Sequence, residues 1–138
     1  AMTGLGGEEK KQTIGYASCT GKNLNQRAGS ITTSFMGGDQ NDIQESKAEG
    51  AKAVVDTADD RNLYINVKNH LSVDCDCSSK PAKPEMADSA ILASLDPVAL
   101  DKASVDLVYE APDGQELIER MESRNGVHTL YYAAEICL

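Results

Sequence analysis

The chain has 138 residues, of which 41% are hydrophobic and 25% charged, a composition typical of one globular domain rather than of a disordered segment. Its 13 basic and 22 acidic residues give a formal net charge of −9. This balance argues against nucleic acid and anionic membranes as partners, because both select clustered Lys and Arg, and no apolar run approaches the roughly 20 residues of a membrane helix.

Residues 1–40 are rich in Gly, Ser, Thr and Asn and carry the weakest secondary-structure signal of the chain. Their pattern allows a short helix over 8–17 and a short strand over 31–35, and Gly37-Gly38 marks a break.

Both ends favour the interpretation that the chain is a fragment of a longer protein. Ala1 before Met2 resembles a residue left after tag removal, and a helical pattern is still running at Leu138. We treat 1–138 as a single domain whose α/β core is 41–138.

The first clear helix is predicted over 42–58. Asp42 is a suitable N-cap, and Glu45 completes a pair of the capping-box kind. Four apolar residues follow at helical spacing and share one face: Ala51, Val54, Val55 and Ala58.

From Leu63 to Cys77 apolar and polar residues alternate, with Asn69 as the exception. Period two is typical of a half-buried strand, so the odd-numbered apolar residues are expected to face the core. Fifteen residues are long for one strand. A bend near 68–70 is therefore expected.

After a loop at 78–84, residues 90–93 predict a short buried strand. Asp96 then caps a helix whose first position is Pro97, where the missing N–H costs nothing. This helix ends near Tyr109, and its apolar face is expected to consist of Leu100, Ala103, Leu107 and Val108.

Asp101 and Asp106 of the same helix are expected on its solvated face. Residues 113–126 predict another helix that ends at an Asn-Gly pair, and Thr129 is placed to cap a last helix over 130–136. The order of elements predicts an α/β fold: a single layered domain with a short, mostly buried sheet packed by several helices.

Four cysteines stand at positions 19, 75, 77 and 137. A bridge between Cys75 and Cys77, which are one residue apart, would be strained. Free thiols in a reducing, cytoplasmic compartment are the simpler interpretation.

The run from Asp74 to Cys77 places four potential metal ligands in four residues. Thiolates bind soft or borderline metals and carboxylates bind hard ones. His70 shares a strand face with both aspartates, whereas the two cysteines point to the opposite face of a regular strand. The predicted metal ligands are Cys75, Cys77, Asp74, Asp76 and His70.

Two other interpretations of this run stay open. Cys75 and Cys77 can continue the buried stripe of Leu71 and Val73 as small hydrophobes, with the aspartates facing water. Alternatively, one of them is a catalytic thiol, which needs a nearby base. The two histidines, His70 and His128, have no spacing that implies contact with a cysteine.

Several stretches of the chain are distinctive: Gly4–Gly7, Ile14–Ser18, Leu63–Val67, Leu71–Cys77, Ile91–Asp101, Glu122–Gly126 and Ala133–Ile136. Together they resemble the domain of unknown function 362 family, and specifically the C-terminal part of its domain. Members of that family are described as iron–sulfur-associated, and many carry a separate ferredoxin-like module. The resemblance implies a transition metal or an iron–sulfur cluster as cofactor, with Asp74–Cys77 as the motif that carries over.

The leading hypothesis is an uncharacterised cytoplasmic metal-binding or redox-associated domain that uses the Asp-Cys-Asp-Cys motif. The alternative is a structural or protein-interaction module with core cysteines and no metal. Neither hypothesis decides whether the protein is an enzyme. The expected partners are a second copy of the chain, a missing segment, or a ferredoxin-like module of the same protein.

Overall fold

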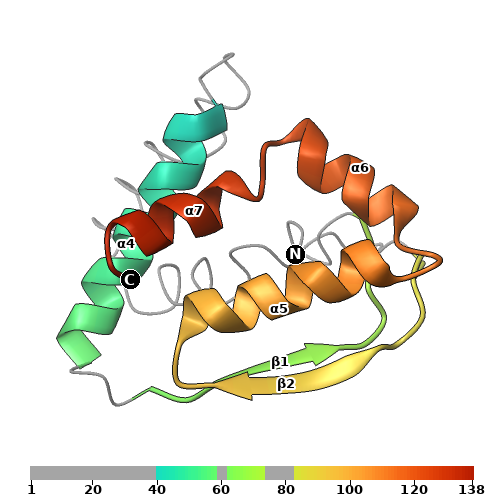
Figure 1. The fold of residues 1–138 in the computed structure, drawn as a ribbon, viewed down its shortest axis with the longest axis horizontal. Coiled ribbons are helices and arrows are strands. Elements are labelled where there is room, and N and C mark those ends of the chain that lie inside the picture. The colour runs from blue at the N-terminus through green and yellow to red at the C-terminus, as the bar shows by residue number, and fades with distance from the viewer. Residues whose placement is uncertain (1–39, 59–61, 74–82) are drawn as a thin grey trace.

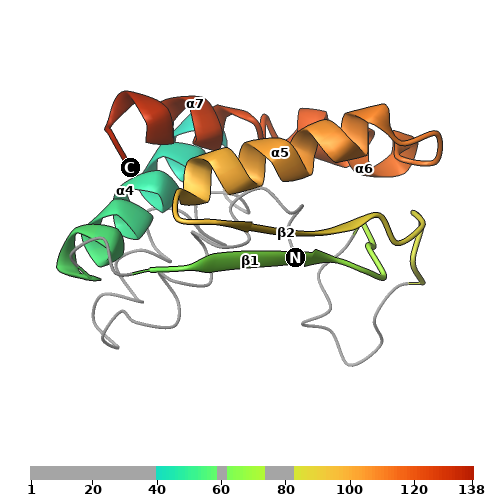
Figure 2. The ribbon, with the colours of Figure 1, turned by 60° about the horizontal axis from the view of Figure 1, so that its bottom comes forward.

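The structure, a computed structural model, describes residues 40–58, 62–73 and 83–138. These residues form four helices and a two-stranded antiparallel sheet, shown in Figure 1: α4 (Gln40–Ala58), β1 (Tyr64–Lys68), β2 (Ala90–Ser94), α5 (Pro97–Glu110), α6 (Gln115–Ser123) and α7 (His128–Glu135). In Figure 2, α5 lies over one face of the sheet, with α6 and α7 on the same side. The predicted α/β class is therefore confirmed.

β1 lies inside the predicted segment 63–77, and β2 extends one residue beyond the predicted 90–93. The two strands pair antiparallel, with Tyr64 opposite Ser94 and Lys68 opposite Ala90. The expected bend is confirmed, because β1 ends at Lys68 and His70 adopts a φ of 50°. That left-handed conformation is uncommon outside glycine and stops the regular alternation of side chains.

The side chains of β1 face the opposite way to the prediction. Tyr64 and Lys68 are 3% and 5% exposed, whereas Ile65 and Val67 are 52% and 59% exposed. The expectation that the odd-numbered apolar residues face the core is therefore wrong for β1. Among the described residues the sheet is covered on its α5 side only, where polar groups of α5 meet β1. The expectation that residues 90–93 form a buried strand is also wrong, because Ile91 of β2 is 73% exposed.

Beyond the bend the odd-numbered residues do turn inward. Leu71 and Val73 are partly buried and pack against the hydrophobic core, and Leu71 forms an isolated bridge with Met86. Apolar side chains therefore face solvent in β1, before His70, and face the core at Leu71 and Val73, after it.

The N-terminus of α5 is built as predicted. Pro97 is the first helical residue, and the Asp96 carboxylate accepts a hydrogen bond of 2.9 Å from the Ala99 N–H. The buried face differs from the expected one, because Ala103 is exposed and Asp101 is fully buried. The prediction that Asp101 faces water is wrong, whereas Asp106 is exposed as expected.

The core joins α5, α6 and α7 above the sheet. Its buried members are Met86, Val105, Val108, Leu117, Met121 and Leu130. The predicted end of α6 is confirmed: Asn125 has a φ of 46°, and the Gly126 N–H donates to the Met121 carbonyl at 2.8 Å. Val127 then packs against the core.

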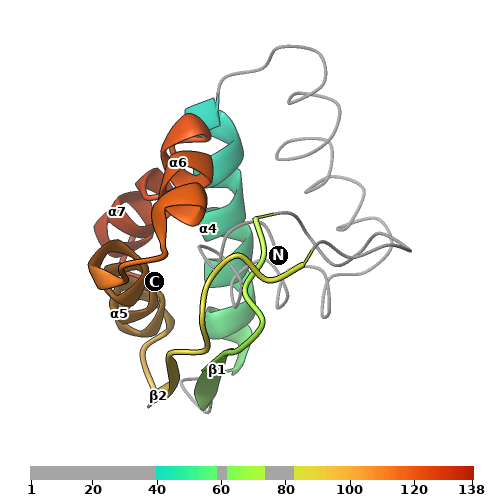
Figure 3. The same cartoon turned by 90° about the vertical axis from the view of Figure 1, so that its right-hand side faces the viewer.

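Helices α4 and α7 lie side by side (Figure 3). They approach closely through small residues, since Ala48, Ala51 and Ala133 are fully buried. Between them Thr129 donates to Gln44 Oε1 at 2.6 Å, and Gln44 Nε2 donates to the Arg124 carbonyl at 3.1 Å.

Two predicted caps are wrong. Because α4 begins at Gln40, Asp42 lies within its first turn. Because α7 begins at His128, Thr129 lies inside the helix, and its hydroxyl bonds to α4 instead of to its own backbone. In both cases the helix begins earlier than the capping residue type indicated.

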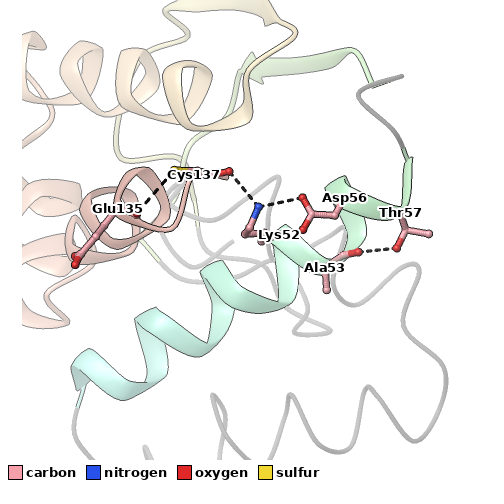
Figure 4. A network of polar contacts seen from close by, with 6 residues as sticks. All are labelled: Lys52, Ala53, Asp56, Thr57, Glu135 and Cys137. Atoms are coloured by element: carbon pink, nitrogen blue, oxygen red, sulfur yellow. Dashed lines mark hydrogen bonds and ion pairs between the residues drawn. The ribbon is translucent and has the colours of Figure 1, made fainter.

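The C-terminal end of the chain is hydrogen-bonded to α4. Lys52 Nζ donates to Asp56 Oδ1 at 3.0 Å and to the Cys137 carbonyl at 3.2 Å (Figure 4). The Cys137 thiol itself is exposed. No helix among the described residues is long and apolar enough to cross a membrane.

Candidate functional site

The predicted ligands Asp74, Cys75, Asp76 and Cys77 lie outside the described residues, as do the elements predicted over 8–17 and 31–35. The described chain stops at Val73 and resumes at Lys83. The structure therefore places the two flanks of the predicted ligand run and the fifth predicted ligand, His70.

The two flanks are tied together by three backbone-centred contacts. Leu71 and Met86 form an antiparallel bridge, and the Glu85 N–H donates to the Leu71 carbonyl at 2.9 Å. The Val73 N–H in turn donates to Glu85 Oε2 at 2.7 Å. The chain before the ligand run and the chain after it are therefore held together up to Val73, the residue that precedes Asp74.

His70 lies at the same end of the sheet, on the bend that follows β1. Its backbone N–H donates to Asp88 Oδ1 at 2.8 Å, so its left-handed conformation is held by a side chain from the returning strand segment. Its ring is exposed, and Nδ1 is hydrogen-bonded to Asn69 Oδ1. An exposed imidazole of this kind can act as a metal ligand in its neutral form.

Within the described part of the chain, no three His, Cys, Asp or Glu side chains gather closely enough to hold a metal ion. The other described histidine, His128, bonds to Glu45 Oε1 at 2.8 Å between α7 and α4. The Cys137 thiol lies near the Glu135 carbonyl. A metal site near His70 would therefore need ligands from outside the described residues, and the 74–77 run is the predicted source.

Sequence reasoning missed a polar cluster between β1 and α5, formed by Asn66, Lys68, Asp101 and Ser104. Asn66 Nδ2 donates to Asp101 Oδ1 at 2.9 Å and to Ser104 Oγ at 3.1 Å. Lys68 Nζ donates to the Ser104 carbonyl at 2.5 Å. Burial lowers the pKa of the Lys68 amine, because the charged form loses hydration.

This buried polar cluster explains why β1 turns its polar side inward. Asp101 and Ser104 lie three residues apart on α5 and so share the helix face that meets the sheet. A buried carboxylate and hydroxyl need hydrogen-bonding partners, which apolar side chains of β1 could not supply. The Asn66 amide supplies a hydrogen bond to each of them. Because side chains alternate along a strand, Tyr64 and Lys68 face the same side as Asn66.

The cluster holds chemically useful groups, but its geometry is that of structural support. Lys68 is 5% exposed and Asp101 is fully buried. The hydroxyl of Tyr64, on the same side of β1, is also buried and has no hydrogen-bond partner within the described residues. One signal for the cluster was present in the sequence: polar residues at alternate strand positions opposite a helix with Asp and Ser three residues apart.

A family model described as Domain of unknown function (DUF362) matches residues 1–106. The match covers more than half of the chain and includes the Asp-Cys-Asp-Cys run, the sheet and the first part of α5. No curated protein and no solved structure is significantly similar. The chain belongs to the DUF362 family.

Proposed function

We propose that this DUF362 member is a cytoplasmic metal-binding or redox-associated domain in which Cys75 and Cys77 are thiolate ligands. Asp74, Asp76 and His70 supply further ligands or hydrogen-bond the cysteine sulfurs. The cofactor would be a transition metal or an iron–sulfur cluster, both of which thiolates bind well.

One structural observation supports the proposal more than any other: the segment between Val73 and Lys83, which carries the cysteines, begins and ends at residues that are held close together. The bridge from Leu71 to Met86 and the Glu85 contact to Val73 hold the two ends of this segment together. Ligands borne on a closed segment have less conformational freedom to lose when a metal gathers them. His70 lies on the bend beside these contacts, where its backbone N–H donates to Asp88 Oδ1.

The number of ligands limits what kind of site this would be. Two thiolates do not complete a tetrahedral metal site, so at least two further ligands are required. The aspartates beside the cysteines and the imidazole of His70 are the candidates on this chain. An open position in such a site would leave room for an exchangeable ligand, and closure by a second chain would favour a structural role.

The test is metal analysis of protein purified without oxygen or chelator. We expect near-stoichiometric metal in the wild type and its loss in the Cys75→Ser/Cys77→Ser double variant. Cys137→Ser is the matched control, because it removes an exposed thiol far along the chain and should leave metal content unchanged. Little metal in the wild type, unaltered by the double variant, would contradict the proposal.

The alternative function is a structural or protein-interaction module whose cysteines are packed in a core and bind no metal. The apolar outer side of the sheet favours an interaction role. Leu71 and Val73, the stripe that the cysteines would continue in this alternative, are partly buried and pack against the core, which fits it. Thiol labelling separates the two functions, with exposed Cys137 as an internal reference. Core cysteines would label slowly in the native protein and normally after unfolding.

A further inference from the structure

The side of the sheet that faces away from α5 carries Ile65, Val67, Ile91 and Ala93, and exposed Leu63 and Leu95 directly adjoin the two strands; these six residues are here named the outer sheet face. They include five of the seven large apolar residues that are exposed within the described part of the chain. Ile91 and Leu95 are the most exposed, at 73% and 76%. Register joins them across the strands, since Ile65 faces Ala93 and Val67 faces Ile91. A contiguous apolar patch of this kind marks an interaction surface.

The outer sheet face carries no charge. Residues 62–67 and 89–95 contain no Asp, Glu, Lys or Arg, although a quarter of the chain is charged. The one charged residue of the two strands, Lys68, is buried on the opposite side. The face therefore gives no preference for a cationic or an anionic partner. Two copies of the chain, each with a net charge of −9, would therefore bring no like charges together at this contact.

The size of the outer sheet face fits a homodimer. Five Leu, Ile and Val side chains at these exposures present on the order of 400 Å² of apolar surface. A standard interface buries about 800 Å² per partner, of which about 65% is apolar in homodimers. The face thus supplies most of the apolar area that one partner of such a dimer needs.

We propose that the outer sheet face pairs with the same face of a second copy of this chain. Two antiparallel sheets pack face to face about 10 Å apart with interdigitated side chains. A twofold axis makes such a contact self-complementary. Ala93, the smallest side chain of the face, lies opposite Ile65 in the register and lets a large side chain of the second copy approach the sheet. If the protein is an interaction module, a second copy of the chain is its partner. This pairing does not depend on metal binding.

The test is sedimentation velocity across a wide range of protein concentration, with reductant present so that exposed Cys137 forms no disulfide dimer. We expect the wild type to be a dimer that dissociates on dilution. Ile91→Lys places a charge in the contact and should raise the dimer dissociation constant more than about tenfold. Tyr131→Lys is the matched control: Tyr131 is 66% exposed on α7, and this variant should dimerise like the wild type.

Circular dichroism checks that each variant is folded, and the milder Val67→Thr keeps a β-branched residue in case Ile91→Lys does not fold. A wild type that is monomeric at every concentration would overturn the pairing, as would a dimer that neither variant weakens. Metal content measured on the same samples keeps the two proposals separate. Ile91→Lys should lose the dimer and keep its metal, whereas Cys75→Ser/Cys77→Ser should lose metal and keep the dimer.

Discussion

The inverted orientation of β1 predicts that neighbouring truncations in this strand differ sharply in their effect on stability. Tyr64 is 3% exposed and Ile65 is 52% exposed. Truncating a buried aromatic residue to Ala costs about 3–5 kcal/mol of unfolding free energy, because transfer and cavity terms add. Ile65→Ala removes a side chain that is half in water in the monomer, so its cost should stay below about 1 kcal/mol.

The assay is urea unfolding followed by circular dichroism, at a protein concentration low enough for the chain to be monomeric. Unchanged slopes of unfolding free energy against urea are needed, so that a shift in midpoint measures stability alone. Tyr64→Phe separates the ring from the hydroxyl. Because that hydroxyl is buried without a partner among the described residues, its removal should be neutral or stabilising. A larger loss for Ile65→Ala than for Tyr64→Ala would refute the orientation of β1.

Three further predictions concern single residues. Gly114→Ala should cost about 1–3 kcal/mol, measured by thermal or urea unfolding, because a Cβ there would lie 2.3 Å from the Val108 carbonyl oxygen. Asp96→Ala should cost about 1 kcal/mol through the lost N-cap of α5, whereas Asp106→Ala, which breaks only an exposed pair, should cost less than about 0.5 kcal/mol. Burial lowers the pKa of Lys68, so between that lowered pKa and 10.5 the unfolded chain binds more protons than the folded one, and stability should rise with pH. Lys68→Met should flatten this rise in unfolding free energies measured across alkaline pH, and an identical slope in the variant would exclude Lys68 as its source.

Much of the local structure followed from short-range signals. The Asp96-Pro97 pair fixed the start of α5, and the Asn125-Gly126 pair fixed the end of α6, because both act through backbone groups that the local chain supplies. The break of the long alternating segment near His70 was also expected, since a single strand rarely continues so far. Such features need no knowledge of what packs against them.

The orientation of β1 could not be predicted in the same way. Alternation shows that Ile65 and Val67 share a side, but it does not show which side a helix covers. That choice depends on Asp101 and Ser104, which stand more than thirty residues later in the chain and bond to Asn66. Sequence reasoning assigned Asp101 to solvent because buried carboxylates are rare, and it therefore missed the polar contacts that face β1.

The caps of α4 and α7 show a related limit. Thr129 is a common N-cap residue type, but its hydroxyl is used by Gln44 of a helix that precedes it by some eighty residues. Of the five predicted metal ligands, the structure describes only His70, on the bend after β1. The metal-binding role of the Asp-Cys-Asp-Cys run stays a prediction.

The most direct test of the proposed function is X-ray absorption at the edge of the metal carried by anaerobically purified protein. For zinc, we expect sulfur neighbours at about 2.3 Å from the metal, together with oxygen or nitrogen neighbours at about 2.0–2.2 Å. The sulfur neighbours should disappear in Cys75→Ser/Cys77→Ser and persist in Cys137→Ser. A spectrum with oxygen and nitrogen neighbours alone in the wild type, or sulfur neighbours that survive the double substitution, would contradict thiolate ligation by Cys75 and Cys77.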